Sequence, residues 1–258
     1  METSNTPISQ KETELYGLIG YPLGHSFSAK FFADKFEKEH IAAAYQNFEI
    51  EEAETLLDIV AEHPTLKGFN VTIPHKQAVI PYLSEMSEEA RAIGAVNVVR
   101  VISEGDQFKL KGYNSDVIGF CRSLQPLLQP CHRKALVLGT GGASKAVIHG
   151  LHKLGISPTY VSRTRREGVL AYEDLTQEII NEHLVIVNCS PVGMFPHTDE
   201  CPNIPYEYLT PQHLLYDLVY NPLETLFLKK GATAGAITKN GLEMLHLQAL
   251  ASWDFWHE

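Results

Sequence analysis

A glycine-rich segment, Gly139-Thr140-Gly141-Gly142, is the part of this 258-residue chain whose residue types point most directly to a ligand. The apolar run Ala135–Leu138 precedes it, a helical pattern follows it, and the strand-like run Thr159–Val161 closes the unit. Glycines in such a turn let the backbone approach a pyrophosphate, and the N–H groups of the next helix point at that anion. Ser144 stands where a third glycine or alanine is usual. The order predicts a dinucleotide-binding unit, although similar turns also occur in loops that bind no phosphate.

The residues after the second strand of this unit bear on the choice of dinucleotide. A site for NAD usually places an Asp or Glu there, which binds the ribose 2′-hydroxyl. Here the segment reads Ser162-Arg163-Thr164-Arg165-Arg166, with no acid before Glu167. Arg side chains bind phosphate bidentately, so we expect the 2′-phosphate of NADP at this tip. The alternative is a solvated basic loop, because clusters of Arg are common on protein surfaces.

A lysine and a carboxylate in the N-terminal half have the chemistry to handle a proton. Lys76 follows the strand-like run Leu66–Ile73, and Asp116 follows the run Gln107–Tyr113. A carboxylate can hold and orient an ammonium group, which then acts as an acid or a base. Each residue also has a simpler interpretation, because Lys76 could be a solvated lysine and Asp116 could cap the helix that follows it.

Two serines, Ser26 and Ser28, lie just before a predicted helix at Ala29–His40. A serine at this place often caps the helix, because its oxygen accepts a hydrogen bond from an N–H group of the first turn. A pair of hydroxyls can instead donate to the carboxylate of a substrate. Both interpretations stay open from the residues alone.

Composition and charge exclude several classes of partner. The net charge is −10, which argues against a nucleic acid or an anionic membrane and requires local positive charge around an anionic ligand. The four cysteines form no CxxC pair, and the twelve histidines show no spacing typical of metal ligands. No signal peptide or transmembrane run is visible, so we expect a cytoplasmic protein with reduced thiols and no bound metal.

The hydrophobic patterns predict the elements that position these residues. In the N-terminal half, strands are expected at Leu15–Gly20, Tyr45–Ile50, Leu66–Ile73, Ala95–Ile102 and Gln107–Tyr113. Helices are expected at Ala29–His40, Glu52–His63, from Lys76 through Ile80, at Ser87–Ile93, and from Val117 to about Leu128. After a linker at Pro126–Arg133, further strands are expected at Leu184–Asn188, Leu214–Val219 and Ala234–Ile237, and helices at Glu224–Lys230 and Leu242–Trp256.

The whole chain resembles the shikimate dehydrogenase family, which includes shikimate and quinate dehydrogenases. The motifs that carry the resemblance are GYPLGHSFS, FNVTIPHK, GAVNVV, GYNSD, VLGTGGASKAV, SRT, NCSPVGM, DLVYNPLET and GLEMLHLQA. Their number and order are far more specific than the glycine turn alone. The resemblance implies an α/β fold with an N-terminal substrate domain, a Rossmann-like NADP-binding domain and a cleft between them. The implied boundaries are 1–115 plus 240–258 for the substrate domain and 116–239 for the NADP-binding domain.

The resemblance also implies roles for individual residues. Lys76 and Asp116 are expected to be the catalytic pair. The expected substrate ligands are Ser26, Ser28, Thr72, Asn97, Tyr220 and Gln248. The expected cofactor-binding residues are Gly139, Thr140, Gly141, Gly142, Ala143, Arg163, Thr164, Met194, Gly241 and Met244.

Three positions depart from the family pattern. Ala29 replaces a proline after the serine pair, Ser115 replaces a threonine before Asp116, and Ser162 replaces an asparagine before Arg163. The first two changes keep the reacting groups. The third weakens contacts on the adenosine side, while the arginines that favour NADP remain.

The resemblance implies NADP-dependent, reversible reduction of 3-dehydroshikimate to shikimate, a step towards chorismate and the aromatic amino acids. The expected partner is this small molecule, with no nucleic acid and no membrane, and a homodimer is compatible with the resemblance. One alternative is a broader quinate/shikimate dehydrogenase that uses NAD or NADP. A second is a methyltransferase, which would normally need an acid after the second strand. A third is a non-catalytic dinucleotide sensor, which would not need both Lys76 and Asp116.

Overall fold

The computed structural model of the protein describes residues 13–24, 27–105 and 107–258. The chain divides into two compact units, and each unit combines segments that are distant in the sequence. The first unit contains the described residues up to Glu85 together with Val98–Gly112, and the second contains Met86–Asn97 and Tyr113–Glu258. The functional boundaries expected above, 1–115 with 240–258 and 116–239, stay a prediction.

The second unit is built on a six-stranded sheet in which all neighbouring strands run parallel. From one edge to the other the strands are β9 (Val169–Ala171), β8 (Ser157–Ser162), β7 (Lys134–Leu138), β10 (Val185–Asn188), β11 (Leu214–Asp217) and β12 (Ile237–Lys239). Numbered by their order in the chain, they follow the order 3-2-1-4-5-6 of dinucleotide-binding sheets. The order reverses between β7 and β10, and ligands bind such sheets beyond the carboxyl ends of the strands at that point.

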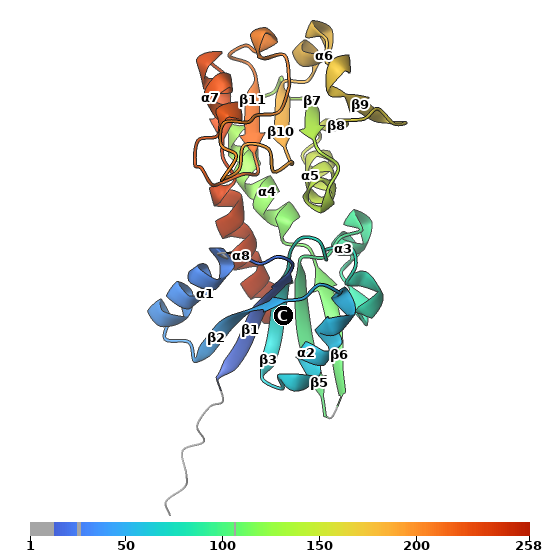
Figure 1. The fold of residues 1–258 in the computed structure, drawn as a ribbon, viewed down its shortest axis with the longest axis vertical. Coiled ribbons are helices and arrows are strands. Elements are labelled where there is room, and N and C mark those ends of the chain that lie inside the picture. Colours follow the sequence, from blue (N-terminus) through green and yellow to red (C-terminus); the bar gives the residue numbers. More distant parts are fainter. Residues whose placement is uncertain (1–12, 25–26, 106) are drawn as a thin grey trace, which may run out of the picture. The chain divides into compact units, whose positions relative to one another are not determined.

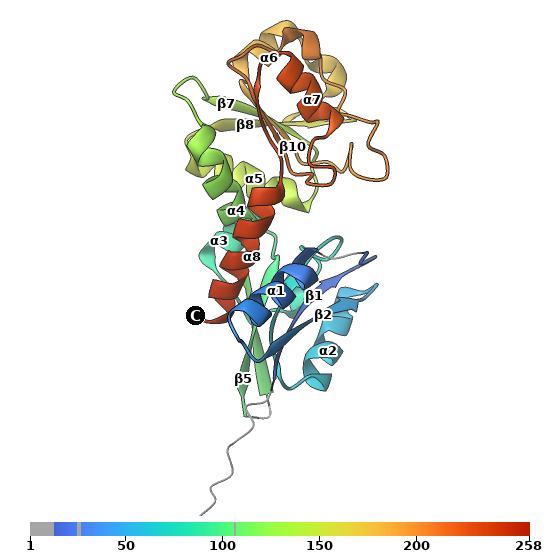
Figure 2. The ribbon, with the colours of Figure 1, turned by 90° about the vertical axis from the view of Figure 1, so that its left-hand side faces the viewer.

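Helices cover both faces of this sheet, which explains why its strands are apolar along their length. The helices of the second unit are α3 (Glu88–Ile93), α4 (Asp116–Leu124), α5 (Gly142–Lys153), α6 (Gln177–Glu182), α7 (Leu226–Thr233) and α8 (Leu242–Trp256). Side chains alternate along β7, so Val137 packs in the core with α4, α5 and α8, while Leu136 and Leu138 pack with α6 and α7. Figures 1 and 2 show these two layers of helices in the second unit.

The first unit contains a mixed sheet. Its strand order is β2 (Ala43–Glu49), β1 (Glu14–Gly20), β3 (Leu66–Val71), β5 (Val98–Glu104), β6 (Gln107–Tyr113) and β4 (Glu85–Met86). Strand β1 runs parallel to β2 and β3, and β3 runs antiparallel to β5. Helices α1 (Phe27–Lys38) and α2 (Leu56–Glu62) pack on this sheet. Tyr45 of β2 stacks on Phe32 of α1, whereas Phe48 contacts His63 after α2, so the two helices lie on opposite faces.

Most of the elements predicted from the sequence are confirmed. The strand–turn–helix–strand unit from β7 to β8 is present, and the last helix has the predicted bounds. The sequence analysis did not predict β4, β9 or α6, which are short and have weak patterns.

Four predictions of elements are wrong in place or type. The strand expected at Ala95–Ile102 lies at Val98–Glu104, because Ala95, Val96 and Asn97 belong to the loop after α3. The helix expected from Lys76 is a series of turns followed by a short 3-10 helix, Ile80–Tyr82, because Pro81 removes a backbone donor. The helix expected to end near Leu128 ends at Leu124, and Pro126 lies in the 3-10 turn after it. The last strand lies at Ile237–Lys239 rather than Ala234–Ile237, because Gly235 still belongs to the turn after α7, with a φ of 80°.

Candidate active site

The glycine turn lies at the point where the strand order of the second sheet reverses. Gly139 follows β7 with a φ of 107°, a conformation that favours glycine. A Cβ atom on Gly139 would lie 3.3 Å from the backbone nitrogen of Ser190, which follows β10. The turns after β7 and β10 therefore approach each other closely, and a side chain at Gly139 would meet both this tight contact and a strained backbone.

The start of α5 is open to a ligand. Thr140 and Gly141 are exposed, and Gly142 and Ala143 are half-buried at the first turn of the helix. Ser144, which stands in place of a third glycine, is fully buried, and its hydroxyl donates to the carbonyl of Gly141 at 2.7 Å. The Ser144 side chain thus lies on the buried side of the turn and does not cover the exposed side. A helix N-terminus after such a turn suits a pyrophosphate.

The basic tip after β8 is exposed, and one of its three arginines is neutralised. Arg165 forms an ion pair with Asp174, whose Oδ2 also accepts the N–H of Ala171 at 2.8 Å. Sequence reasoning did not find this acid, because it lies after β9. Arg163 and Thr164 remain exposed at the tip, and the charge of Arg163 opposes the rise that burial causes in the pKa of Tyr172.

The second unit brings together three polar residues that the sequence separates by up to 151 positions. The Asn97 side-chain nitrogen donates to Asp116 Oδ1 at 2.8 Å and lies 3.3 Å from Gln248 Oε1. Asn97 and Asp116 are each 3% exposed. We call Asn97, Asp116 and Gln248 the amide–carboxylate cluster. Three predicted site residues therefore occupy one small volume, in which an amide holds a carboxylate in place.

The capping interpretation of Asp116 is wrong. The N–H of Val117 is bonded to the side-chain oxygen of Asn114 at 3.3 Å, so Asn114 supplies the acceptor at the start of α4. Asp116 is the first residue of the helix, and its carboxylate accepts from Asn97 instead. Its side chain is thus used outside the helix.

Two further serines support the cluster, and sequence reasoning missed their part. The Ser115 N–H donates to Asn97 Oδ1 at 2.7 Å, and the Ser115 hydroxyl lies 3.2 Å from that of Ser252 on α8. Ser252 in turn donates to the carbonyl of Gln248 at 2.8 Å. The available signal was the spacing of Gln248 and Ser252, which puts both on one face of α8.

The approach of α4 and α8 depends on one glycine. A Cβ atom on Gly119 would lie 2.5 Å from the carbonyl oxygen of Met244 and 3.3 Å from Gln248 Cβ. The two helix backbones are therefore nearly in contact at this point. This close approach brings Gln248 to Asn97.

The first unit holds Ser28, Thr72 and Lys76. Helix α1 begins at Phe27, so Ser28 lies in its first turn, where its hydroxyl opposes the rise in the pKa of Tyr45. Burial raises the pKa of Tyr45, whose hydroxyl donates to Asn70 Oδ1 at 2.9 Å. Ser26 lies outside the described residues.

Thr72 and Lys76 follow the carboxyl end of β3. The Thr72 N–H donates to the carbonyl of Ile19, and the Thr72 carbonyl accepts from His75 at 2.9 Å. The buried His75 is anchored by a 2.7 Å contact with the carbonyl of Ile50, next to the half-buried Lys76. Lys76 lies in the first unit and Asp116 in the second, so their pairing stays a prediction.

The remaining expected residues lie in the second unit, with Met194, Tyr220 and Gly241 on loops and Met244 on α8. Met194 is 44% exposed, and Tyr220 is half-buried with its pKa raised by burial. Gly241 donates to the carbonyl of Val219 at 3.1 Å. Met244 is buried in the core between the sheet and α8, so its part in binding a cofactor stays a prediction.

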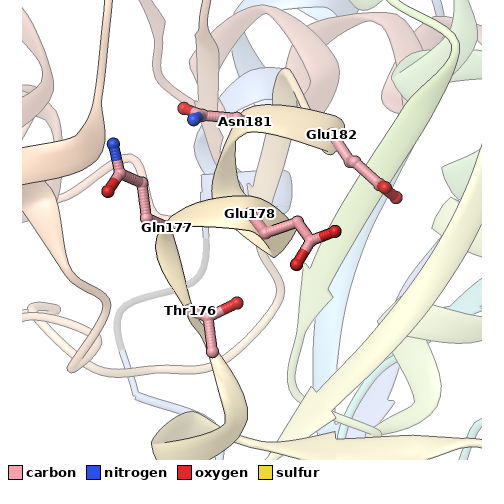
Figure 3. Close-up of a pocket in the computed structure, with 5 residues that line it drawn as sticks. All are labelled: Thr176, Gln177, Glu178, Asn181 and Glu182. Atoms are coloured by element: carbon pink, nitrogen blue, oxygen red, sulfur yellow. The ribbon is translucent and has the colours of Figure 1, made fainter.

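Other surface features do not match the predicted site. Figure 3 shows a hollow along α6 that is lined by Thr176, Gln177, Glu178, Asn181 and Glu182. The carboxylates of Glu178 and Glu182 would repel a pyrophosphate, so we do not include this hollow in the dinucleotide site. In the part of the chain that the structure describes, no three His, Cys, Asp or Glu side chains gather as metal ligands would. Within the same residues, no helix is long and apolar enough to cross a membrane.

Comparisons with known proteins agree with this arrangement. Residues 18–99 match the family described as shikimate dehydrogenase substrate binding domain. The shikimate dehydrogenase (NADP(+)) of Caldanaerobacter subterraneus subsp. tengcongensis is 38% identical, over 95% of this chain and 91% of the relative.

Two solved structures have the same fold. The shikimate 5-dehydrogenase of Thermus thermophilus, in complex with NADP(H) and shikimate, has a TM-score of 0.81 and 30% identity over 94% of this chain and 93% of that one. The quinate dehydrogenase of Corynebacterium glutamicum, in complex with NAD, has a TM-score of 0.83 and 27% identity over 95% and 94%. The sequence match along nearly the whole chain, together with the sheet order and the glycine turn, shows that this chain belongs to the shikimate dehydrogenase family.

Proposed function

We propose that this protein is an NADP-dependent shikimate dehydrogenase, which reduces 3-dehydroshikimate reversibly to shikimate. The observation that carries the proposal is the amide–carboxylate cluster, because it joins Asn97, Asp116 and Gln248 in the unit that also holds the glycine turn. The cluster gathers three residues that the family motifs assign to catalysis and substrate binding, and a protein that only binds a dinucleotide would not need them together.

The glycine turn and the basic tip fit NADP. Gly139 gives the backbone the close approach that a pyrophosphate needs, and the first turn of α5 offers its N–H groups. The exposed guanidinium of Arg163 and the hydroxyl of Thr164 suit a 2′-phosphate. When bound, the reduced cofactor supplies the hydride.

We assign the proton transfer to Lys76, with Asp116 as the carboxylate that orients it. This assignment is supported by the family motifs around both residues and by the hydrogen bond that fixes Asp116. Ser26, Ser28, Thr72, Asn97, Tyr220 and Gln248 are the proposed substrate ligands. Asn97 has a defined partner in its own unit, so its amide is held in place before a substrate arrives.

The test is nicotinamide absorbance with purified protein, offered shikimate or quinate with NADP or NAD in all four combinations. We expect turnover with shikimate and NADP, because no acid directly follows β8 to bind a free 2′-hydroxyl. Equal turnover with quinate or NAD would move the protein to the broader dehydrogenases of the family. No turnover in any of the four combinations, with NADP still bound, would identify a non-catalytic sensor instead.

The role of Lys76 has its own test. The variant Lys76→Ala should lower kcat by about 10²–10⁴, the usual worth of general acid–base help, with less change in shikimate binding. Lys67→Ala is the control, because Lys67 is also half-buried and lies on the strand that leads to Lys76. Wild-type turnover in Lys76→Ala would refute the assignment.

We further propose that the enzyme acts in the cytoplasm and can form a homodimer. All four cysteines are free thiols, which fits a reducing compartment. Light scattering would separate the mass of one chain from that of two.

A further inference from the structure

A buried carboxylate that has no part in the chemistry above lies at the carboxyl end of β11. Asp217 is 0% exposed and accepts three hydrogen bonds. They come from Asn188 Nδ2 at 2.9 Å, from the Val219 N–H at 3.0 Å and from the Thr225 hydroxyl at 2.6 Å. A buried carboxylate is costly unless it is fully bonded, so a position that keeps one calls for a physical reason.

The bond to Asn188 connects Asp217 with the loop after β10. Asn188 is the last residue of β10, and its Oδ1 accepts both the N–H of Ser190 at 3.1 Å and the Ser190 hydroxyl at 2.7 Å. Ser190 lies directly against Gly139, as described above. Through two side chains, Asp217 is therefore linked to the glycine turn and to the loop that carries Met194.

The bond to Val219 connects Asp217 with the loop after its own strand. Val219 precedes Tyr220, and its carbonyl accepts the N–H of Gly241 at the start of α8. The N–H of Leu218 donates to the carbonyl of Asn188 at 3.0 Å, which ties the two loops together a second time. The turns after β7, β10, β11 and β12 thus meet around one buried acid.

We propose that Asp217, acting through Asn188 and Val219, is a positioning residue that holds the four turns of the dinucleotide face in one arrangement. The inference rests on the proposed function in so far as these turns bind NADP. Three donors from different segments converge on this one side chain, so its hydrogen bonds fix the directions of the loops that carry them. The reaction rate depends on where these turns hold the nicotinamide ring, since a displacement of about 1 Å can lower the rate about 10²-fold.

The test compares two disruptive variants with a conservative one. Asp217→Ala removes all three acceptor contacts, whereas Asn188→Ala removes the bridge to Ser190 together with one donor to Asp217 and keeps the bonds from Val219 and Thr225. Asp217→Asn is the rescue, because its oxygen can still accept from Asn188 and Val219 while its NH₂ group faces the Thr225 hydroxyl. His213→Ala is the control, since His213 is a buried, hydrogen-bonded side chain at the opposite end of β11.

The readouts are amide hydrogen exchange, the dissociation constant for NADP and the rate of shikimate oxidation. In Asp217→Ala we expect the amides of Ser190 and Val219 to exchange at least about tenfold faster, NADP to bind more weakly and kcat/KM to fall about 10–100-fold. Asn188→Ala should loosen Ser190 but not Val219. Asp217→Asn should stay within about threefold of the wild type in all three.

Two results would overturn the proposal. One is unchanged exchange at Ser190 and Val219 in Asp217→Ala and unchanged exchange at Ser190 in Asn188→Ala. The other is an equal rise in the exchange rates of these two amides in His213→Ala, when this variant loses as much thermal stability as Asp217→Ala. If the wild type fails to oxidise shikimate, the proposed function fails, while exchange and NADP binding still decide the role of Asp217.

Discussion

Replacing Gly119 by alanine tests whether the contact between α4 and α8 builds the amide–carboxylate cluster. The new Cβ would lie 2.5 Å from the carbonyl oxygen of Met244 and 3.2 Å from the backbone nitrogen of Gln248. Ordinary contacts of this kind are near about 3.5 Å, so the helices must separate by about 1 Å. The atom in the way belongs to a backbone, and a change of rotamer cannot relieve the contact.

Two effects of opposite sign set the size of the change. Alanine is the better helix former, which stabilises α4 by about 1 kcal/mol. Overpacking against a backbone costs about 1–3 kcal/mol. We therefore expect a net loss of about 0–2 kcal/mol in the free energy of unfolding and a Tm lower by up to several degrees. Because Gln248 moves away from Asn97, kcat/KM for shikimate should fall by about 10²-fold at most.

The assay combines thermal unfolding with steady-state kinetics, and a second glycine supplies the control. A Cβ atom on Gly231 of α7 would lie 2.5 Å from Leu215 Cδ2, so Gly231→Ala crowds a buried side chain rather than a backbone, at a place remote from the cluster. Gly231→Ala should lower Tm and leave kcat/KM unchanged. The reasoning is refuted if Gly119→Ala loses stability without losing activity, or if both variants lose activity in proportion to Tm.

Two further predictions concern charge. Arg163→Ala should raise KM for NADP at least about tenfold with little change in KM for shikimate. Arg165→Ala should change KM for NADP much less, because Asp174 already neutralises Arg165. Equal effects of the two variants would contradict the role of Arg163. Burial raises the pKa of Asp217 from 3.8 to about 6, so the native state binds more protons than the unfolded state between these values, and stability falls as pH rises through this window. An asparagine does not titrate, so the free energy of unfolding of Asp217→Asn minus that of the wild type should rise by about 3 kcal/mol from about pH 4 to about pH 7, measured by urea unfolding. A difference that stays constant over this range would contradict the pKa shift.

Local patterns determined the dinucleotide unit of this protein. The apolar run of β7, the glycine turn and the helical spacing of α5 all act within about thirty residues, and a local pattern of that length is what sequence reasoning resolves. The same holds for α8, whose predicted bounds are those of the structure. The choice of NADP also followed from local sequence, because one segment of arginines without an acid carries it.

The weak points of the sequence analysis have physical causes. The turns around Lys76 were mistaken for a helix, because the apolar spacing at Val79 and Ile80 outweighed the two prolines that flank them. The pairing of Arg165 with Asp174 was missed, because it depends on β9, a three-residue strand at the edge of the sheet. Short elements carry too few residues for a periodic signal.

The sequence by itself determined the candidates for the chemistry, since the motifs name a lysine, a carboxylate, hydroxyls and amides in order along the chain. Only the tertiary structure decided that Asp116 accepts from Asn97 rather than capping α4, and that Gln248 joins them from 151 residues away. It also revealed Asp217 as the centre on which four turns converge. The reason is that these hydrogen bonds depend on how close two helices or two strand ends approach, and that distance is set by packing between segments that no local pattern relates.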